Sequence, residues 1–332
     1  MRATVRFVLD RIKTYDASGE TQRLAAELEE TRRKLKQRKK QIRRLKERAE
    51  RAEAEPFDAS KLLWIFGTGR SGTTWLSSML GELPGLSVWR EPLVGALFGH
   101  FYFTIAPHRK DKRSIRGDEH MDIFLNSARY LVLAGACSRF PDAELVVIKE
   151  PHGSIGAPVM SEALPESRLF VLVRDPRDVV ASAMDAMREG SWRSDRWQAR
   201  WGKFETPSQA DTDPDAFVLE WAKNCAQHVG NAVAAYHSHE GPKVLCRYED
   251  LRRSPYAILS GALCELSLTY DEAILRTSVE KHRFEAIPEE ERGPGKFYRR
   301  ATPGGWRDDL TPQQARMVED VCRPILEELY DG

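Results

Sequence analysis

Cysteine is scarce in this 332-residue sequence, and its five copies form no CxxC pair. An odd number of scattered cysteines excludes a disulfide framework or a zinc ribbon and is typical of buried thiols in a reducing compartment. Long apolar runs are absent too, because the longest, residues 62–66 and 169–173, are far shorter than the roughly 20 residues that span a bilayer. Residues 1–13 are interrupted by charges and do not resemble a signal peptide, so we expect a cytoplasmic protein.

An excess of charge of one sign is missing as well. The chain carries 51 Lys+Arg and 50 Asp+Glu, a formal net charge of +1, which argues against a generally basic protein that binds nucleic acid. Hydrophobic residues make up 41% of the sequence, which excludes a disordered or collagen-like chain. The charges are unevenly distributed, since residues 1–56 hold 17 basic and 10 acidic side chains and residues 57–332 hold 34 and 40.

Proline and glycine are absent between Gln22 and Ala54, where strong helix formers predominate. An apolar seam with alternating three- and four-residue spacing runs through this segment, and its apolar members are Leu24, Leu28, Leu35, Ile42, Leu45, Ala49 and Ala52. The pattern predicts an N-terminal helical arm, residues 1–56, with a coiled coil of about four heptads that joins chains into a homo-oligomer. Two other readings stay open: a single solvated helix, and peripheral contact between the basic residues 32–48 and an anionic membrane.

Short β-branched runs alternate with helical segments beyond Pro56. Residues 62–66, 145–149, 169–173 and 243–247 are predicted strands whose hydrophobicity is continuous rather than alternating. Strands of this kind are buried on both faces. Residues 57–332 are therefore predicted to form an α/β domain with a central, doubly wound parallel sheet flanked by helices.

The segment GTGRSGTTW, residues 67–75, lies between a predicted strand and a helix expected from about Thr73. Glycines in such a turn let backbone N–H groups converge at the helix N-terminus, which forms a cradle for phosphate. Gly67 and Gly72 have the spacing of an ATP-binding P-loop, but Thr73 stands where that motif has lysine, and the nearest cation is Arg70. These features disfavour a kinase or an ATPase.

A second motif, LFVLVRDPRDVVASAM, spans residues 169–184. Arg174 follows the predicted strand, and Ser182 lies two helical turns further on. Pro176 suits the first turn of that helix. The guanidinium and the hydroxyl are placed to converge on one phosphate. The alternative is that Arg174 and Asp175 only pair and cap the junction between the strand and the helix.

Together these two motifs resemble those of the sulfotransferases that use 3′-phosphoadenosine 5′-phosphosulfate (PAPS) and release 3′-phosphoadenosine 5′-phosphate (PAP). Two later segments are similar to the same family, CRYEDLRRSP at residues 246–255 and RRATPGGWRDDLT at residues 299–311. The resemblance extends over residues 61–330 and implies a P-loop NTPase-like sulfotransferase fold. Arg70 stands where many cytosolic members have lysine, so the sequence is more similar to the carbohydrate and tyrosylprotein branches of the family.

The resemblance also assigns residues to the donor. It implies that the 5′-phosphosulfate is held by Arg70, Ser71, Gly72, Thr73 and Thr74, the 3′-phosphate by Arg174, Ser182, Arg299 and Arg300, and the adenosine by Trp75 and Tyr248. Trp75 is equally compatible with a core position. Ala301 and Gly305 depart from the family's last loop, which has Gly and Asp there. No metal is expected, because a sulfuryl group carries less charge than a phosphoryl group and no cluster of Mg²⁺ ligands is visible.

The base that accepts the proton of the acceptor hydroxyl has two candidates. Glu91, in WREP, follows the phosphate-loop helix at a distance similar to that of the acidic residue in the carbohydrate and tyrosylprotein branches. His152, in VIKEPHGS, lies one position away from the histidine of the cytosolic members. Lys149 either supports the transferring group or only extends from a strand end. Glu91 is the leading candidate and His152 the alternative.

The acceptor is the least determined partner, and a carbohydrate, a glycolipid or another small metabolite is expected. Residues 95–116, rich in aromatics and histidine, and residues 189–215, in which three tryptophans alternate with arginines, are candidate acceptor walls, and the second is also a candidate lid. Packing of those tryptophans on the core is the alternative. Two other function classes remain, a P-loop nucleotide kinase or NTPase and a non-catalytic scaffold whose coiled coil is the working part.

Overall fold

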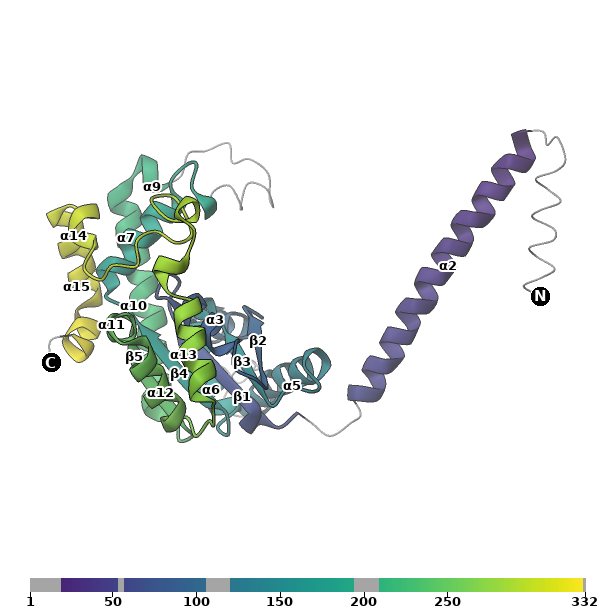
Figure 1. The fold of residues 1–332 in the computed structure, drawn as a ribbon, viewed down its shortest axis with the longest axis horizontal. Helices are drawn as coiled ribbons and strands as arrows, with labels where there is room; N and C mark the ends of the chain where they lie inside the picture. Colours follow the sequence, from purple (N-terminus) through teal and green to yellow (C-terminus); the bar gives the residue numbers. More distant parts are fainter. Residues whose placement is uncertain (1–18, 53–56, 106–119, 194–208, 331–332) are drawn as a thin grey trace. The chain divides into compact units, whose positions relative to one another are not determined.

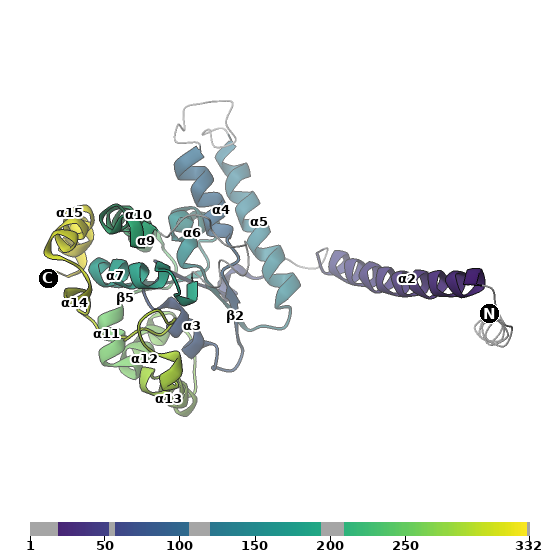
Figure 2. The same ribbon diagram turned by 90° about the horizontal axis from the view of Figure 1, so that it is seen from above.

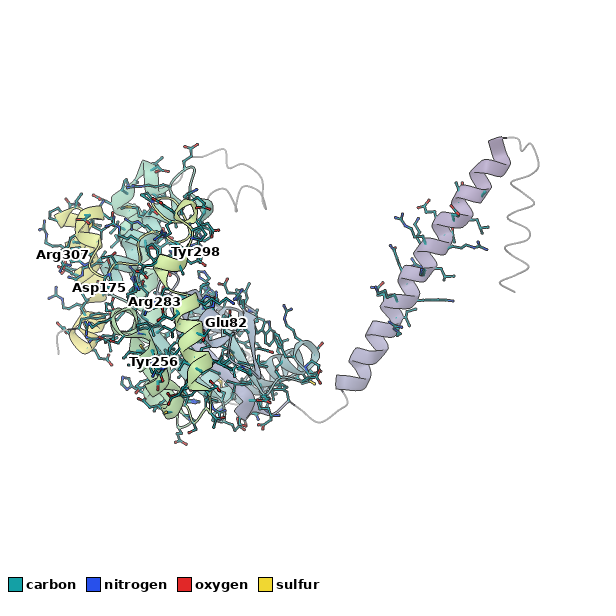
Figure 3. All side chains as sticks on the ribbon, viewed as in Figure 1. Glu82, Asp175, Tyr256, Arg283, Tyr298 and Arg307 are labelled. Carbon is teal, nitrogen blue, oxygen red and sulfur yellow. The ribbon has the colours of Figure 1, made fainter. Side chains whose placement is uncertain are left out.

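A computed structural model describes residues 19–52, 57–105, 120–193 and 209–330. The chain divides into two units, residues 1–56 and 57–332. In the first unit the helix α2 (Gly19–Ala52) is continuous over its 34 residues (Figure 1). Its side chains project outward (Figure 3), and Leu28, Leu35 and Ile42 of the apolar seam are exposed. The coiled coil stays a prediction.

The second unit is built on a five-stranded sheet in which all neighbouring strands are parallel. Its strands are β1 (Leu62–Gly67), β2 (Leu86–Arg90), β3 (Leu145–Lys149), β4 (Arg168–Val173) and β5 (Lys243–Arg247), in the order β2-β3-β1-β4-β5. Four of them confirm the predicted strands to within one residue. The sequence pattern does not predict β2, because none of its residues is fully buried and it lies at an edge of the sheet.

The sheet separates two hydrophobic cores, and alternate residues of each central strand enter one or the other. Leu62, Trp64 and Phe66 of β1 enter the first core, whereas Leu63 and Ile65 enter the second. This burial on both faces is the physical reason for the continuous hydrophobicity of the strands. It confirms the predicted doubly wound α/β architecture.

Helices cover both faces of the sheet (Figure 2). The first core is closed by α5 (Met121–Arg139), α6 (Ala157–Ala163), α7 (Pro176–Met187), α10 (Pro214–Ser238) and α15 (Pro312–Leu329), and the second by α3 (Thr73–Leu80), α11 (Tyr248–Arg253), α12 (Pro255–Glu265) and α13 (Glu272–Lys281). Shorter elements are η1 (Ala59–Lys61), α4 (Val94–His100), η2 (Phe101–Ile105), η4 (Pro151–Gly156), α9 (Gln209–Thr212), η5 (Phe284–Ala286), η6 (Glu289–Glu291) and α14 (Trp306–Asp309). None of the described helices has both the length and the hydropathy that a membrane span requires.

The strand order determines where a site forms. The chain places β2 and β3 on one side of β1, and β4 and β5 on the other. Parallel strands end at one shared edge, and a crevice opens there where the strand order reverses. The segments that follow β1, β3 and β4 therefore meet beside the end of β1.

Candidate active site

The loop between β1 and α3 is shaped by its glycines. Gly72 has φ 94° and precedes α3, and a Cβ on it would lie 2.6 Å from Cδ2 of Tyr248. No described side chain caps the N-terminus of α3. The amides of Thr73 and Thr74 are thus left without a capping partner at the positive end of the helix, which is a favourable place for an anion.

Arg70 is held within this loop by several contacts. Its backbone is in the left-handed region, with φ 73°. Its Nε donates to Oγ of Ser182 at 3.0 Å, and its Nη2 donates to the carbonyl oxygen of Phe297 at 3.1 Å. The guanidinium lies 5.5 Å from the ring centre of Trp192 and 5.4 Å from that of Phe297. Burial, together with Arg174 and other cations nearby, lowers its pKa to about 10, so it is charged at neutral pH.

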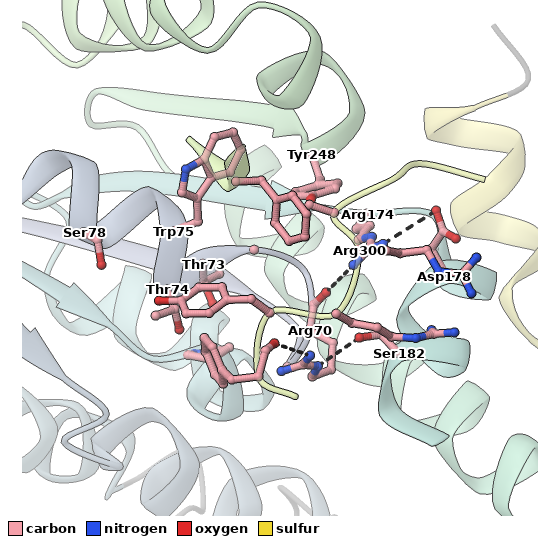
Figure 4. Close-up of a pocket in the computed structure, with 18 of the residues that line it drawn as sticks. Arg70, Thr73, Thr74, Trp75, Ser78, Arg174, Asp178, Ser182, Tyr248 and Arg300 are labelled. Atoms are coloured by element: carbon pink, nitrogen blue, oxygen red, sulfur yellow. Dashed lines mark hydrogen bonds and ion pairs between the residues drawn. The ribbon is translucent and has the colours of Figure 1, made fainter. Parts of the chain in front are cut away.

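Arg174 links the loop to the segment after β4 (Figure 4). Its Nη1 donates to the carbonyl oxygen of Arg70 at 3.0 Å, and its guanidinium stacks on Tyr248 at 4.6 Å. Its Nε is buried without a hydrogen-bond partner among the described residues. Arg70 contacts both Arg174 and Ser182, and the convergence of these two residues on one phosphate stays a prediction. Asp175 does cap α7, since its carboxylate accepts from the amide of Arg177 at 2.9 Å.

The C-terminal loop, residues 292–305 between η6 and α14, lies beside Arg70 and α7. Arg299 and Arg300 both pair with Asp309, and Arg300 does so at 2.9 Å. Asp178, which sequence reasoning did not single out, fastens this loop to α7 by accepting from the amides of Gly304 at 2.7 Å and Trp306 at 2.9 Å. The arginines predicted for the 3′-phosphate are thus held in place by carboxylates.

Trp75 and Tyr248 form an aromatic corner. Their rings meet edge to face, with centroids 6.1 Å apart. The indole N–H of Trp75 donates to the carbonyl oxygen of His282 at 2.7 Å. Trp75 is partly buried, and it both packs against the second core and lines the cavity described below, so its role against adenosine stays a prediction. Tyr248 is buried between Gly72 and Arg174.

Glu91, Lys149 and His152 come together at the ends of β2 and β3. The amide of Glu91 donates to the carbonyl oxygen of Lys149 at 2.8 Å, and its carboxylate pairs with the Lys149 ammonium. Lys149 is buried and paired, and its support of the transferring group stays a prediction. Burial alone would raise the pKa of Glu91, but the hydrogen bond and charge of Lys149 outweigh it and lower that pKa.

His152 lies next to the loop between β1 and α3. Its ring is so close to Gly69 that a Cβ there would lie 3.4 Å from Cε1. Burial lowers the pKa of His152, and the attraction of Glu91 only partly offsets this effect. The imidazole is therefore neutral at pH 7 and has a nitrogen that can accept a proton.

Glu150, between Lys149 and Pro151, is a buried carboxyl group beside these residues. One of its oxygens accepts from the amide of Ala96 at 3.2 Å, so it caps α4, whose own N-cap residue Leu93 offers no side-chain hydrogen bond. Burial raises the pKa of Glu150 to about 7. Because α4 begins three residues after Glu91, this cap fixes the segment that carries the candidate base.

These features line one cavity of about 710 Å³ (Figure 4). Its walls include every residue predicted for the site except Ser71: Arg70, Gly72, Thr73, Thr74, Trp75, Glu91, Lys149, His152, Arg174, Ser182, Tyr248, Arg299 and Arg300. Ser71 is buried, and its hydroxyl donates to the carbonyl oxygen of Thr68 at 2.8 Å, so its side chain stabilises the turn instead. Within the described ranges, no group of three or more His, Cys, Asp or Glu side chains is placed to hold a metal ion.

The two predicted acceptor walls differ. From residues 189–215, Trp192 and Arg193 line the cavity, while residues 194–208, with the other two tryptophans, lie outside the described residues. Of residues 95–116, those described (95–105) do not line it, and the ring of Phe98 packs on Phe124 instead. The lid stays a prediction.

Comparisons with known proteins identify the family. A model of the sulfotransferase domain matches residues 60–331. The crystal structure of mouse sulfotransferase SULT7A1, complexed with PAP, is similar over 82% of this chain and 86% of that chain, with 15% identity and a TM-score of 0.51. Sulfotransferase STF9 from Mycobacterium avium is similar over 98% of this chain and 90% of that chain, with 13% identity and a TM-score of 0.54. No curated protein matches the sequence significantly.

Because the match covers most of its length, the chain belongs to the sulfotransferase domain family and is an enzyme of sulfuryl transfer. At these identities the two solved structures support the fold alone. Membership of this family excludes the alternative of a P-loop nucleotide kinase or NTPase. The carbohydrate-type branch, which the family model does not specify, stays a prediction.

Proposed function

We propose that the chain transfers a sulfuryl group from PAPS to a hydroxyl group of a carbohydrate, a glycolipid or another small metabolite. The observation that carries this proposal is the shared cavity, in which four segments distant in sequence bring together the residues that the resemblance assigns to the donor. The buried Nε of Arg174 supports an anionic occupant, because it has no partner among the described residues.

The donor's two charged ends correspond to two parts of the cavity. Arg70, with the loop amides of Gly72, Thr73 and Thr74, would hold the 5′-phosphosulfate. Arg174, Ser182, Arg299 and Arg300 would hold the 3′-phosphate, with Trp75 and Tyr248 against the adenosine. When bound, the donor supplies the activated sulfuryl group, and negative charge develops on the oxygen that leaves.

Arg70 and the α3 amides stabilise that developing charge, since they are fixed before the reaction begins. Glu91 accepts the proton of the acceptor hydroxyl, and Lys149 orients its carboxylate. His152, neutral and on the same wall, is the alternative base. These cations suffice for the charge that develops, so turnover is expected to be unchanged by EDTA.

Binding of PAP tests the donor assignment. Calorimetry on the full chain should show PAP binding that Arg174→Ala weakens by about tenfold or more, because a charged hydrogen bond is lost. Arg323→Ala, on the exposed face of α15, is the matched control and should leave the affinity unchanged. A chain that does not bind PAP contradicts the donor assignment, whether or not it binds ATP with Mg²⁺.

We further propose that the helical arm joins chains into a homo-oligomer. The exposure of Leu28, Leu35 and Ile42 at seam spacing supports this, because apolar side chains in such a row are stabilised by burial against a second helix. Peripheral binding of residues 32–48 to an anionic membrane is the alternative, and the test of association in the Discussion distinguishes the two.

A further inference from the structure

Most cations that line the cavity have a carboxylate partner. The ion pairs are Lys149 with Glu91, Arg174 with Asp178, Arg252 with Glu285, Lys281 with Glu82, and Arg299 and Arg300 with Asp309. Within the part of the chain that the structure describes, three arginines of the wall form no ion pair, and they are Arg70, Arg90 and Arg193. Arg70 faces the donor's phosphosulfate in the proposed function, which leaves two arginines unassigned.

Both unassigned arginines lie beside the candidate base. Arg90 ends β2 and immediately precedes Glu91, and it is paired in register with Lys149. Arg193 lies close enough to Glu91 and His152 to lower the pKa of each. It also contributes to lowering the pKa of Arg70, which places it where the loop and the base meet.

Among the described residues, Arg193 has no carboxylate that is left free to pair with it. Its guanidinium is partly buried and lies 5.8 Å from the ring centre of Trp221. Burial lowers its pKa, and Glu91 is the carboxylate that opposes this effect. Glu91, however, is already paired with Lys149. A desolvated cation in this position is stabilised when an anion enters the cavity.

The donor alone does not account for these charges. In the proposed function the phosphate and sulfate groups of the donor contact Arg70, Arg174, Arg299, Arg300 and the N-terminus of α3. Arg90 and Arg193 lie outside that set and next to the group that takes the acceptor's proton. Their charge is therefore available to the acceptor.

We propose that the acceptor is an anionic hydroxyl compound. It carries a carboxylate, a sulfate or a phosphate group close to the reacting hydroxyl, and Arg90 and Arg193 bind that group while Glu91 receives the proton. This inference rests on the proposed function and narrows its substrate class.

Matched pairs of acceptors provide the test. The full chain, saturated with PAP, is titrated by calorimetry with glucuronate against glucose, with glucose 6-phosphate against glucose, and with 4-hydroxybenzoate against 4-hydroxybenzyl alcohol. At least one anionic member is expected to bind about tenfold or more tightly than its neutral partner. Arg193→Met and Arg90→Met should each reduce that preference to about threefold or less, and Arg193→Lys should keep part of it.

The controls separate this inference from the proposed function. Arg323→Met should keep the full preference, and PAP affinity should stay within about threefold in both cavity variants, with unchanged melting temperatures. If no anionic member binds more tightly than its neutral partner, the inference is overturned even when PAP binds. It is overturned too if the preference survives both substitutions, or if Arg193→Met weakens PAP and leaves the preference intact. Failure of the wild type to bind PAP contradicts the proposed function instead.

Discussion

Arg70 illustrates how one residue connects three segments of the site. Its guanidinium donates to Ser182 on α7 and to Phe297 in the C-terminal loop, and its carbonyl oxygen accepts from Arg174. A lysine has a single ammonium and lacks the planar fork that makes the first two contacts from separate nitrogens. The arginine in this loop therefore both supplies charge and organises its neighbours.

Replacing Arg70 with lysine tests this dual role. Arg70→Lys keeps the charge but loses the paired contacts with Ser182 and Phe297, so PAP affinity should fall by about tenfold or more. Arg253→Lys, on the exposed surface of α11, is the matched control and should bind PAP normally. Calorimetry provides the measurement. Equal PAP affinity in Arg70→Lys and the wild type would show that charge alone matters at this position.

The identity of the base is a second question at the residue scale, and a midpoint above pH 4.5 in the pH dependence of kcat/KM would exclude Glu91. The pKa of Glu91 is lowered from an ordinary value of 4.5, whereas that of His152 is lowered from 6.5. A base works only when it is deprotonated, so activity is lost as the pH falls through its pKa. With Glu91 as the base, the midpoint of the fall in kcat/KM should lie below pH 4.5.

The corresponding variants complete this test with an acceptor that the wild type sulfates. Glu91→Gln should reduce kcat by about 10²- to 10⁴-fold, and His152→Ala should reduce it much less. PAP affinity, measured alongside, should stay close to that of the wild type in both. A kcat that survives in Glu91→Gln but disappears in His152→Ala would assign the base to the histidine.

At the scale of elements, glycines allow α4 and η4 to pack backbone to backbone. A Cβ on Gly95 would lie 2.5 Å from the carbonyl oxygen of Gly153, and one on Gly156 would lie 2.1 Å from that of Gly95. These are the elements that follow Glu91 on one side and Lys149 on the other. Their close contact therefore fixes the distance between the two partners of the ion pair.

An added methyl group at this contact should be costly. Gly156→Ala is expected to reduce the free energy of unfolding by about 2 kcal/mol or more, because backbone atoms on the opposite side cannot move away easily. Gly230→Ala is the matched control, since a Cβ there meets nothing within 4 Å and Gly230 lies inside α10. It should raise stability by about 0.5–1 kcal/mol. Urea denaturation measures both, and an equally stable Gly156→Ala would contradict the close packing.

Glu150 predicts a pH dependence of stability at the same contact. Its folded pKa of about 7 lies above its ordinary value of 4.5, so between these pH values the folded chain binds more protons than the unfolded chain. The contribution of Glu150 to stability is therefore fully present below about pH 4.5 and decreases as the pH rises to 7. Glu150→Gln removes this dependence.

Comparison of the wild type with Glu150→Gln isolates the contribution of Glu150. His228, whose pKa is lowered to about 4, changes stability in the opposite direction, but it does so in both proteins. Urea denaturation at pH 5 and pH 7.5 should show that the wild type loses on the order of 2–3 kcal/mol relative to Glu150→Gln as the pH rises. A constant difference between the two proteins would show that the Glu150 carboxyl group titrates normally.

The same elements show what the sequence can reveal. The loop after β1 and the segments after β3, β4 and β5 are predictable, because continuous apolar strands precede them and the ends of parallel strands meet at one edge. β2 is not, since a half-exposed edge strand lacks that signal. Glu150 and Asp178 look like ordinary charged residues in the sequence, and they acquire their roles from amides of α4 and of the C-terminal loop.

At the scale of the whole molecule, the net charge of +1 conceals two opposite distributions. Residues 57–332 carry 34 basic and 40 acidic side chains, yet the described residues that line their cavity include nine Lys and Arg and only three Asp and Glu. Local charge therefore favours a polyanionic ligand in a domain that is acidic as a whole. The helical arm, in contrast, is basic as a whole, and it carries an exposed apolar seam.

That seam makes the oligomeric state depend on single residues of α2. Ile42→Lys would place a charge inside a helix–helix interface and should weaken association by at least about tenfold, whereas Gln37→Lys adds the same charge away from the seam and should not. Sedimentation of the full chain measures association, and PAP affinity should be the same in both variants because the described residues that line the cavity include none of α2. A wild type that is monomeric and binds phosphatidylserine vesicles in a salt-sensitive way would favour the membrane reading, and a monomer that does not bind them would leave α2 a solvated helix.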